Sequence, residues 1–309
     1  MEIISRSYTK CRAGKNLITT VMMCFSLTVA GCQSESAPEP PAVNDQDIVE
    51  KKEGVDYFLP KIDLSHWKVT LPVGKPTEVK PPEILQYATN ATLLPFMYND
   101  STDGSLVFYT YPGASTANSS YSRTELREQM VPGSNHTNWT FEQGGRMRGT
   151  LAVPEISKDK NGKYHRAIIM QIHGRLTDEQ RDLIGEDDNN APPVLKIYWA
   201  NEKIRVKTKQ LKDRKASGAD LLPVSAWTDD EGVYFDEKVG FGKFTLEVVA
   251  SEGRLEVTLN DKQTLVYKGI HMEKWSAFEN YFKAGNYLVT KDEGAYARVK
   301  YYALEISHP

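Results

Sequence analysis

KFTLEVVASEGRLEVTLNDKQTLVY, residues 243–267, contains three short runs in which apolar and polar side chains alternate. An alternation of period two is typical of a strand with one face in a core. Polar turn residues such as Asn260 and Asp261 separate the runs. The stretch therefore predicts consecutive antiparallel β-strands joined by polar turns.

Strand-like segments recur outside this stretch, at 105–111 and 297–306. Helical patterns are few, and only residues 82–87 suggest one short helical turn. Many short strands separated by turn residues are typical of a β-sandwich or jelly roll. Such folds commonly form one domain of 200–250 residues, so we expect a single all-β domain over residues 55–309.

The first 31 residues differ from the rest of the chain. A basic start precedes an apolar run at 17–30, which is short for a transmembrane helix and ends in small residues. This pattern predicts a signal peptide over 1–31. Its end, LTVAGC at 27–32, resembles a bacterial lipobox. We therefore expect an exported lipoprotein, with Cys32 lipidated and anchored to the outer membrane of the cell envelope. The alternative is a secreted or periplasmic protein in which Cys32 is incidental.

Residues 32–54 are rich in Pro, Ser and Glu and predict a flexible tether. The chain's three cysteines, Cys11, Cys24 and Cys32, all precede the expected domain, which therefore contains no disulfide and no thiolate nucleophile. The net charge of −3 argues against nucleic-acid binding, because such proteins usually carry a basic excess. A locally basic groove for an anionic sugar polymer remains compatible with it.

Residues 123–127, RTELR, are the first of three segments with a shared chemical theme. On a strand, Arg123, Glu125 and Arg127 project from the same face. Two guanidinium groups on either side of a carboxylate form a row suited to binding sugar carboxylates, with Glu125 holding the arginines in place. The alternative is a surface ladder of ion pairs.

The second segment is residues 171–173, QIH. Gln171 and His173 share one strand face, while Met170 and Ile172 point to the opposite layer. Here an amide donor lies beside an imidazole that titrates near neutral pH. The alternative is a hydrogen-bonded structural histidine.

The third segment is residues 281–287, YFKAGNY. Tyr281, Lys283, Gly285 and Tyr287 share one strand face. We expect Gly285 to leave room for a ligand close to the backbone. An aromatic core strand is the alternative, but Lys283 in the middle of the face argues against it.

Lys196 and Tyr198 also alternate toward one face, so they either extend the groove or are ordinary surface residues.

RTELR, QIH and YFKAGNY, in this order and at this wide spacing, resemble the three signature motifs of the alginate lyases of polysaccharide lyase family 7. The resemblance covers most of the chain after residue 57. It implies a concanavalin-like β-jelly-roll with a cleft across its concave sheet. It also implies cleavage of 1,4-linked mannuronate and guluronate chains by β-elimination, without a cofactor. We expect the partner to be alginate or its oligosaccharides, and the protein to be a monomer.

The resemblance also implies residue roles. Arg123 and Gln171 would neutralise the sugar carboxylate, His173 would be the base for guluronate, and Tyr287 the acid. Tyr287 would serve as both acid and base for mannuronate. The residues expected to bind substrate are Glu125, Arg127, Lys196, Tyr198, Tyr281 and Lys283.

The third motif departs from the family at its end, because members often continue it with Asn-Gln where this chain has Leu288 and Val289. In the family, the Ile of the second motif is associated with guluronate-containing substrates. Ile172 matches it, although it should face the core. The departure puts the sugar contacts beyond Tyr287, and hence endo or exo cleavage, in doubt.

Other functions fit the sequence less well. A glycoside hydrolase needs two positioned carboxylates, and no such pattern is present. A non-catalytic carbohydrate-binding module would explain the fold, yet would not require Gln171, His173 and Tyr287 together. The six histidines show no paired metal spacing, so we expect no metal site. The acidic loop at 185–190 predicts a mobile flap beside the cleft.

Overall fold

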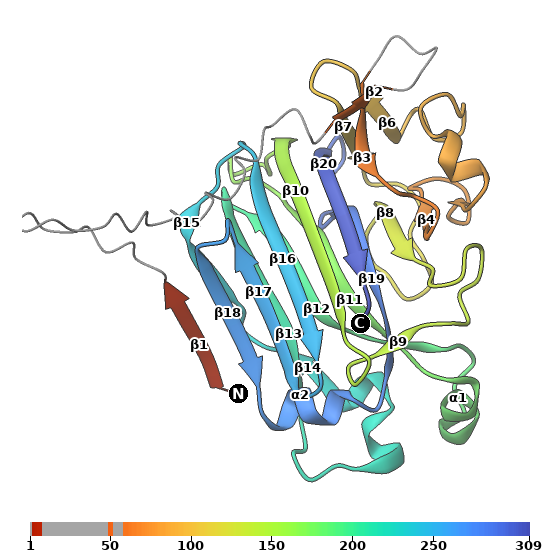
Figure 1. Cartoon of the computed structure of the whole chain (residues 1–309), viewed down its shortest axis with the longest axis vertical. Helices are drawn as coiled ribbons and strands as arrows, with labels where there is room; N and C mark the ends of the chain where they lie inside the picture. The colour runs from red at the N-terminus through yellow and green to blue at the C-terminus, as the bar shows by residue number, and fades with distance from the viewer. Residues whose placement is uncertain (1, 8–48, 52–57) are drawn as a thin grey trace, which may run out of the picture.

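Two sheets stacked face to face form the body of the protein, and they are antiparallel except where β3 pairs with β20 (Figure 1). The computed structural model describes residues 2–7, 49–51 and 58–309. The first sheet contains β1 (Glu2–Ser7), β2 (Val49–Lys51), β3 (Phe58–Ile62), β6 (Met97–Asp100), β7 (Ser105–Thr110), β10 (Gly145–Ile156), β16 (Phe244–Ser251), β17 (Arg254–Leu259), β18 (Gln263–Lys268) and β20 (Ala297–Ser307). The two-layer all-β architecture predicted from the alternation is confirmed.

The second sheet carries the three motifs. It contains β4 (Trp67–Thr70), β5 (Glu78–Val79), β8 (Arg123–Glu128), β9 (Trp139–Thr140), β11 (Arg166–Arg175), β12 (Asn190–Ala200), β13 (Lys203–Leu211), β14 (Trp227–Asp229), β15 (Val233–Lys238) and β19 (Glu279–Leu288). Its main strands run in the order β14-β13-β12-β11-β19-β8-β4-β5. Segments far apart in the sequence therefore lie side by side, with β19 between β8 and β11.

The stretch that decides the fold class forms β16, β17 and β18, paired antiparallel as predicted. The turn between β17 and β18 places Asn260 and Asp261 at positive φ angles of 51° and 53°. Asn and Asp tolerate this conformation better than most other residues. The short helical turn predicted at 82–87 is present as a 3-10 helix, η2 (Glu83–Gln86).

Two short α-helices were not predicted, α1 (Asp178–Ile184) and α2 (Ile270–Trp275). The helix α1 has no buried residue, so it has no apolar stripe that periodicity could detect. A capping box fixes its start, because Thr177 and Gln180 each accept the other's backbone N–H. The other helices in the described part of the chain are the 3-10 turns η3 (Gly218–Leu221) and η4 (Val224–Ala226). No helix of the described residues is long and apolar enough to cross a membrane.

Strand pairing begins earlier in the chain than the expected domain start at residue 55. Val49–Lys51, assigned to the tether, pairs with β3, which would otherwise leave its backbone groups unpaired on that side. Within the predicted signal peptide, Glu2–Ser7 pairs with β18. The structure is that of the uncleaved chain, so removal of this segment stays a prediction. Residues 8–48, including Cys32, lie outside the described residues.

The core lies between the two sheets, and alternate residues of the second sheet point into it. Met170, Ile172, Leu126 and Phe282 are fully buried there. The prediction that Met170 and Ile172 face the opposite layer is confirmed. Their strand neighbours consequently point out of the sandwich, on the side away from the first sheet.

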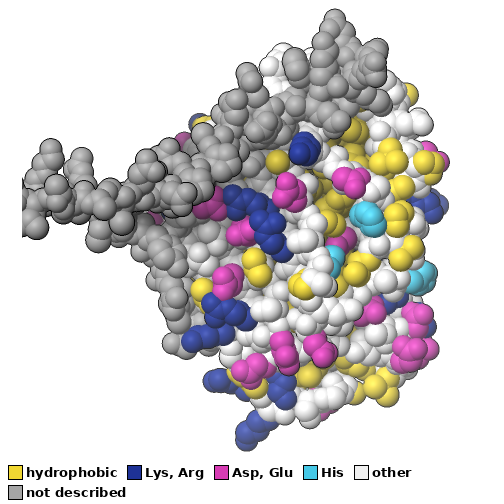
Figure 2. Space-filling view, viewed as in Figure 1, with side chains coloured by type: hydrophobic (Ala, Val, Ile, Leu, Met, Phe, Trp, Pro, Cys, Tyr) yellow, Lys and Arg dark blue, Asp and Glu magenta, His cyan; other side chains and the backbone are white. Residues whose placement is uncertain are grey.

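The outer face of the first sheet carries no excess of either sign of charge. Figure 2 shows acidic and basic side chains intermixed over the face turned to the viewer. On the first sheet Arg146 pairs with Glu247 at 2.6 Å and Arg148 with Asp261 at 2.8 Å. Because both signs are matched there, this face offers no continuous attraction for a polyanion.

Gly285 does not open space for a ligand, as the sequence suggested. Its φ is +137°, and an added Cβ would lie 2.7 Å from the Thr124 carbonyl oxygen and 2.9 Å from the Glu125 Cα. Both atoms belong to the neighbouring strand β8. Glycine is therefore required here because strands β8 and β19 approach each other closely.

We expect Gly285→Ala to destabilise the fold by about 2 kcal/mol or more, because φ strain and a backbone clash add together. Gly162→Ala is the matched control, since Gly162 also has positive φ (+78°) but no atom within 4 Å of an added Cβ. It should cost only about 1 kcal/mol. Urea unfolding measures both, and equal losses in the two variants would contradict the packing argument.

Candidate active site

Strand register brings the three motifs together on the outward face of the second sheet. Tyr287 lies opposite Arg123, and Lys283 lies opposite both Arg127 and Gln171. His173 lies opposite Tyr281. The residues predicted to share strand faces therefore form one surface across β8, β19 and β11.

Glu125 is the centre of this surface, although it is only 1% exposed. Gln171 Nε2 donates to Glu125 Oε1 at 2.5 Å, and Lys283 Nζ lies 2.5 Å from Oε2. Arg123 Nη1 donates to the same Oε2 at 3.2 Å. Both oxygens of Glu125 are therefore engaged, and the carboxylate holds Arg123, Gln171 and Lys283 in place. The expected contact of Glu125 with substrate stays a prediction.

Arg123 is fixed from two sides and keeps several of its N–H donors free. Its guanidinium carbon lies 4.1 Å from the centre of the Tyr287 ring, a cation–π contact. Its Nε is buried and has no hydrogen-bond partner. Buried donors are normally paired, so the unpaired Nε of a residue that lines the cleft is a candidate donor to a ligand. The Gln171 amide, whose Nε2 carries two hydrogens, likewise has one left over after binding Glu125.

His173 is held as a neutral imidazole. Its Nδ1 lies 2.9 Å from the Gly174 carbonyl oxygen, which can only accept, so Nδ1 carries the proton and Nε2 is free. The ring stacks on Tyr281 with centroids 5.2 Å apart. Desolvation, aided by the nearby cations of Lys283 and the arginines, lowers the pKa of His173 to about 3. Near neutral pH the side chain is therefore a base with an available lone pair.

Tyr287 has a partner that the motifs did not reveal. Its hydroxyl lies 2.8 Å from Ser119 Oγ, and Ser119 Oγ donates to the Tyr121 carbonyl oxygen at 3.0 Å. The Tyr287 hydroxyl therefore donates to Ser119 and is aimed by it. Ser119 lies in the loop before β8, and no spacing rule in the sequence singles it out.

Arg127 is positioned differently from Arg123, and Glu125 does not hold it. Its Nη1 donates to the Glu128 carbonyl oxygen at 2.6 Å, and its Nη2 donates to Asn138 Oδ1 at 2.8 Å. It also lies 4.1 Å from the centre of the Tyr281 ring. Arg127 therefore fastens the loop after β8 while one side of it lines the cleft.

Lys283 and Tyr281 have shifted pKa values for the same main reason. Desolvation, together with the charge of Arg123, lowers the pKa of Lys283 to about 8 despite the stabilising contact with Glu125. Desolvation raises the pKa of Tyr281, which keeps the phenol protonated.

Two cavities, of about 450 and 250 Å³, meet at the centre of the cleft. They share Asn118, Arg123 and His173. Arg127, Tyr281 and Lys283 line the larger cavity, whereas Gln171 and Tyr287 line the smaller one. A ligand that runs through both passes over the predicted catalytic residues.

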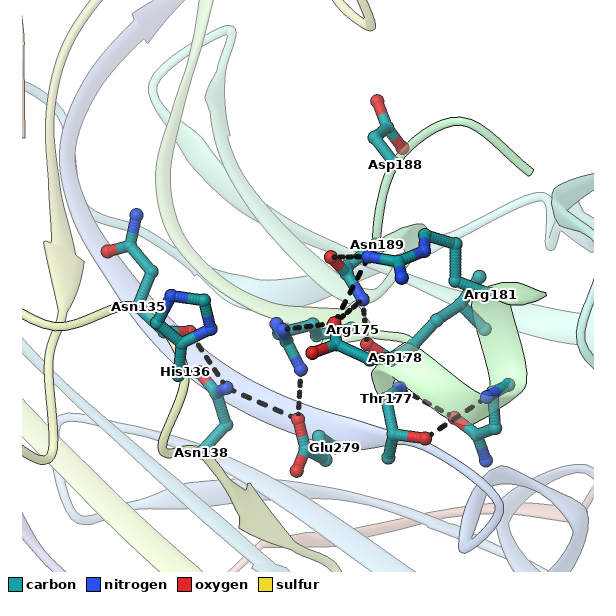
Figure 3. Close-up of polar contacts among 12 residues, drawn as sticks. Asn135, His136, Asn138, Arg175, Thr177, Asp178, Arg181, Asp188, Asn189 and Glu279 are labelled. Carbon is teal, nitrogen blue, oxygen red and sulfur yellow. Dashed lines mark hydrogen bonds and ion pairs between the residues drawn. The ribbon is translucent and has the colours of Figure 1, made fainter.

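The far end of the larger cavity is a polar network that ties α1 to the sheet (Figure 3). Arg175 binds Glu279 at 2.7 Å and Asp178 at 3.6 Å, and Asn189 donates to Asp178 at 2.9 Å. This network places the 185–190 loop beside the cleft, as predicted. The mobility of that loop stays a prediction.

The 185–190 loop also touches the opposite side of the cleft. Asn118 Nδ2 donates to Asp188 Oδ2 at 2.8 Å, and both residues line the larger cavity.

Within the described part of the chain, no group of three or more His, Cys, Asp or Glu side chains is arranged to hold a metal ion.

Lys196 and Tyr198 line the smaller cavity, as expected of a groove extension. The charge of Lys196 is already matched, because its Nζ binds Asp229. Tyr198 is largely buried, and desolvation raises its pKa. Of the two residues that depart from the third motif, Leu288 is buried in the core, while Val289 lines the cavity.

The chain is similar in sequence and in fold to known proteins. The family model described as alginate lyase matches residues 62–308. The crystal structure of alginate lyase A1-II′, a member of polysaccharide lyase family 7, is 28% identical with a TM-score of 0.61, covering 80% of this chain and 96% of that one. A variant of the same lyase, with a histidine changed to asparagine and a tyrosine to phenylalanine, was solved in complex with substrate (GGMG). It is 27% identical over 80% and 94% of the two chains, with a TM-score of 0.60.

An alginate lyase from Pseudomonas aeruginosa shares the fold at 21% identity and a TM-score of 0.58, over 80% of this chain and 100% of that one. No curated protein matches the chain. The jelly-roll fold expected from the resemblance is confirmed. The match of the family model over most of the folded region shows that the chain belongs to the alginate lyases of polysaccharide lyase family 7.

Proposed function

We propose that this alginate lyase performs β-elimination with Arg123, Gln171, His173 and Tyr287 as its catalytic residues. The observation that carries the proposal is the buried Glu125, which fixes two carboxylate-binding donors beside a neutral histidine. The reaction requires removal of the C5 proton next to the sugar carboxylate and then loss of the C4 oxygen. Charge builds up on that carboxylate as the proton leaves, so neutralising it is the main task.

The free Nε of Arg123 and the second amide hydrogen of Gln171 donate to the sugar carboxylate. Donors fixed in advance toward a developing charge are worth about 3–4 kcal/mol each in favourable sites. Lys283, whose pKa is lowered to about 8, still carries its proton at neutral pH and adds positive charge nearby. Tyr281, Arg127, Lys196 and Tyr198 contact the sugars on either side.

His173 Nε2 accepts the C5 proton of guluronate, and the C5–H electrons form the C4=C5 double bond. The C4–O bond breaks, and the Tyr287 hydroxyl protonates the departing oxygen. For mannuronate, Tyr287 takes both roles: its phenolate oxygen accepts the C5 proton and then delivers it to the departing C4 oxygen. Positioned proton transfer of this kind contributes about 10²–10⁴-fold to the rate.

Guluronate-containing chains are the proposed substrates. Support comes from the similar A1-II′ lyase, whose complexes hold GGMG as substrate and GGG as product. Ile172 is fully buried, so it acts on substrate choice only by placing Gln171 and His173. Product analysis on defined guluronate and mannuronate oligomers tests this point, and cleavage of mannuronate oligomers alone would exclude it.

Tyr287→Phe should lower kcat on alginate by about 10²-fold or more while leaving the fold intact, because it removes the acid and keeps the ring under Arg123. Absorbance of the new C4=C5 double bond measures the reaction. Tyr109→Phe, on β7 of the first sheet and likewise with a guanidinium over its ring, is the matched control and should stay active. A fully active Tyr287→Phe variant would contradict the assignment, and alginate binding by the wild type without any absorbance increase would favour a binding module.

Export and lipid anchoring through Cys32 form a separate proposal, supported by the apolar run at 17–30 and the lipobox-like end at 27–32. The part of the predicted tether that precedes the strand at 49–51 would then let the lyase domain reach polymer away from the membrane. Expressed in a bacterium with lipoprotein processing, the wild type should fractionate with outer membranes. Cys32→Ser should fractionate away from them, and equal membrane association of both would refute the anchor.

A further inference from the structure

A third cavity, of about 280 Å³, continues the cleft beyond the catalytic centre. It shares Arg166, Tyr198 and Val289 with the smaller of the two cavities described above. Arg205 and Tyr234 complete the wall that faces away from Arg123. The three cavities therefore form one path across the strands of the second sheet, from β4 and β5 to β15.

Strand register sets the length of this path. One cross-strand row joins, in order, Arg123, Tyr287, Ile168, Tyr198, Arg205 and Tyr234. Adjacent strands are about 4.8 Å apart, so Arg205 lies four strands, or about 19 Å, from Arg123. A 1,4-linked pyranose advances the polymer by a similar distance per unit. Arg205 is therefore about four sugar units from the uronate that Arg123 binds.

The cations at this far end are not matched by carboxylates. Among the described residues, neither Arg166 nor Arg205 forms an ion pair, in contrast to Lys196 with Asp229. Arg205 Nη2 donates to the Glu231 carbonyl oxygen, and its Nε is buried without a partner. Arg205 also lies 5.3 Å from the centre of the Tyr234 ring, and Arg166 lies 5.8 Å from that of Tyr198.

Asp159 is the acidic residue that lines this cavity, and its carboxylate accepts the backbone N–H groups of Asn161 and Lys163. The cavity therefore keeps a positive balance, with donors that suit a carboxylate. Arg205 and Tyr234 resemble Arg123 and Tyr287 in two ways. In both pairs a guanidinium lies over a tyrosine ring, and the arginine Nε has no hydrogen-bond partner.

An apolar floor joins the two cationic ends. Ile168, Tyr198 and Ala200 form a buried cluster separate from the main core, and Tyr287 and Val289 pack against it. Val289 is one of the residues that depart from the family motif, and its apolar side chain extends this floor. Such a floor suits the C–H faces of sugar rings whose carboxylates are held at either end.

We propose that Arg166 and Arg205, with Tyr198 and Tyr234, form a distal subsite for the carboxylate of a uronate about four units from the one on Arg123. This inference rests on the proposed function and adds a length requirement to it. An oligomer too short to reach from Arg123 to Arg205 gains nothing from the distal subsite. Longer oligomers and polymer gain binding there, without a change in the chemical step.

The test uses kinetics on uronate oligomers of increasing length, from trimers to octamers, with the full-length wild type, Arg166→Gln, Arg205→Gln and the double variant. KM for octamers should rise about tenfold in each single variant, the scale of one lost charge-assisted hydrogen bond, with kcat retained. The kcat/KM for trimers should stay within about twofold of wild type in Arg205→Gln, as for an ordinary surface substitution. Arg254→Gln removes the same charge from the first sheet and should match wild type at every length.

Unchanged octamer KM in both single variants would overturn the inference while the proposed function stands. An equal loss on trimers and octamers would also overturn it, since the residues would then act on folding or chemistry. Arg166 is exposed, so its variant gives an answer even where Arg205→Gln fails to fold. An inactive wild type on all lengths would instead overturn the proposed function, and this inference with it.

Discussion

A carboxylate buried beneath the cleft is the constraint on which the site depends. Burying the charge of Glu125 is costly unless donors surround it. The three donors come from three strands: Arg123 on β8, Gln171 on β11 and Lys283 on β19. Removing any of them would leave a charge poorly compensated, so their geometry is fixed before substrate arrives. The Arg123 Nε and the second Gln171 hydrogen are left without a partner in residues that line the smaller cavity.

The same cations determine the state of the base. His173 stays neutral because desolvation and the charges of Lys283 and the arginines oppose its protonation, which lowers its pKa to about 3. A locally positive cleft therefore coexists with a net chain charge of −3. The opposite face, where both signs are paired, does not compete for the polymer. Positive potential attracts the anionic chain and also keeps the proton acceptor ready.

Strand alternation alone predicted which side of the sheet Arg123, Gln171, His173 and Tyr287 occupy, because the side-chain period of a strand is fixed. Alternation could not predict how deeply each side chain is buried or which groups it binds, because both depend on the neighbouring strands. Alternation therefore gave no sign that Glu125 is only 1% exposed, and Gly285 was expected beside a ligand instead of against β8. Arg127 binds the loop after β8, and Ser119 aims Tyr287 from a loop without a pattern. The helix α1 lacked an apolar stripe, and only its Thr177–Gln180 cap could have revealed it.

We infer that Glu125 organises the site from beneath the cleft. The steady-state kinetics of Glu125→Gln on alginate tests this role, with circular dichroism to confirm that the variant is folded. We expect kcat to fall about 10²-fold or more, as when a fixed donor to a developing charge is lost, while the fold is kept. A folded variant with wild-type kcat would contradict the account, because Arg123, Gln171 and Lys283 would then hold their positions without the carboxylate.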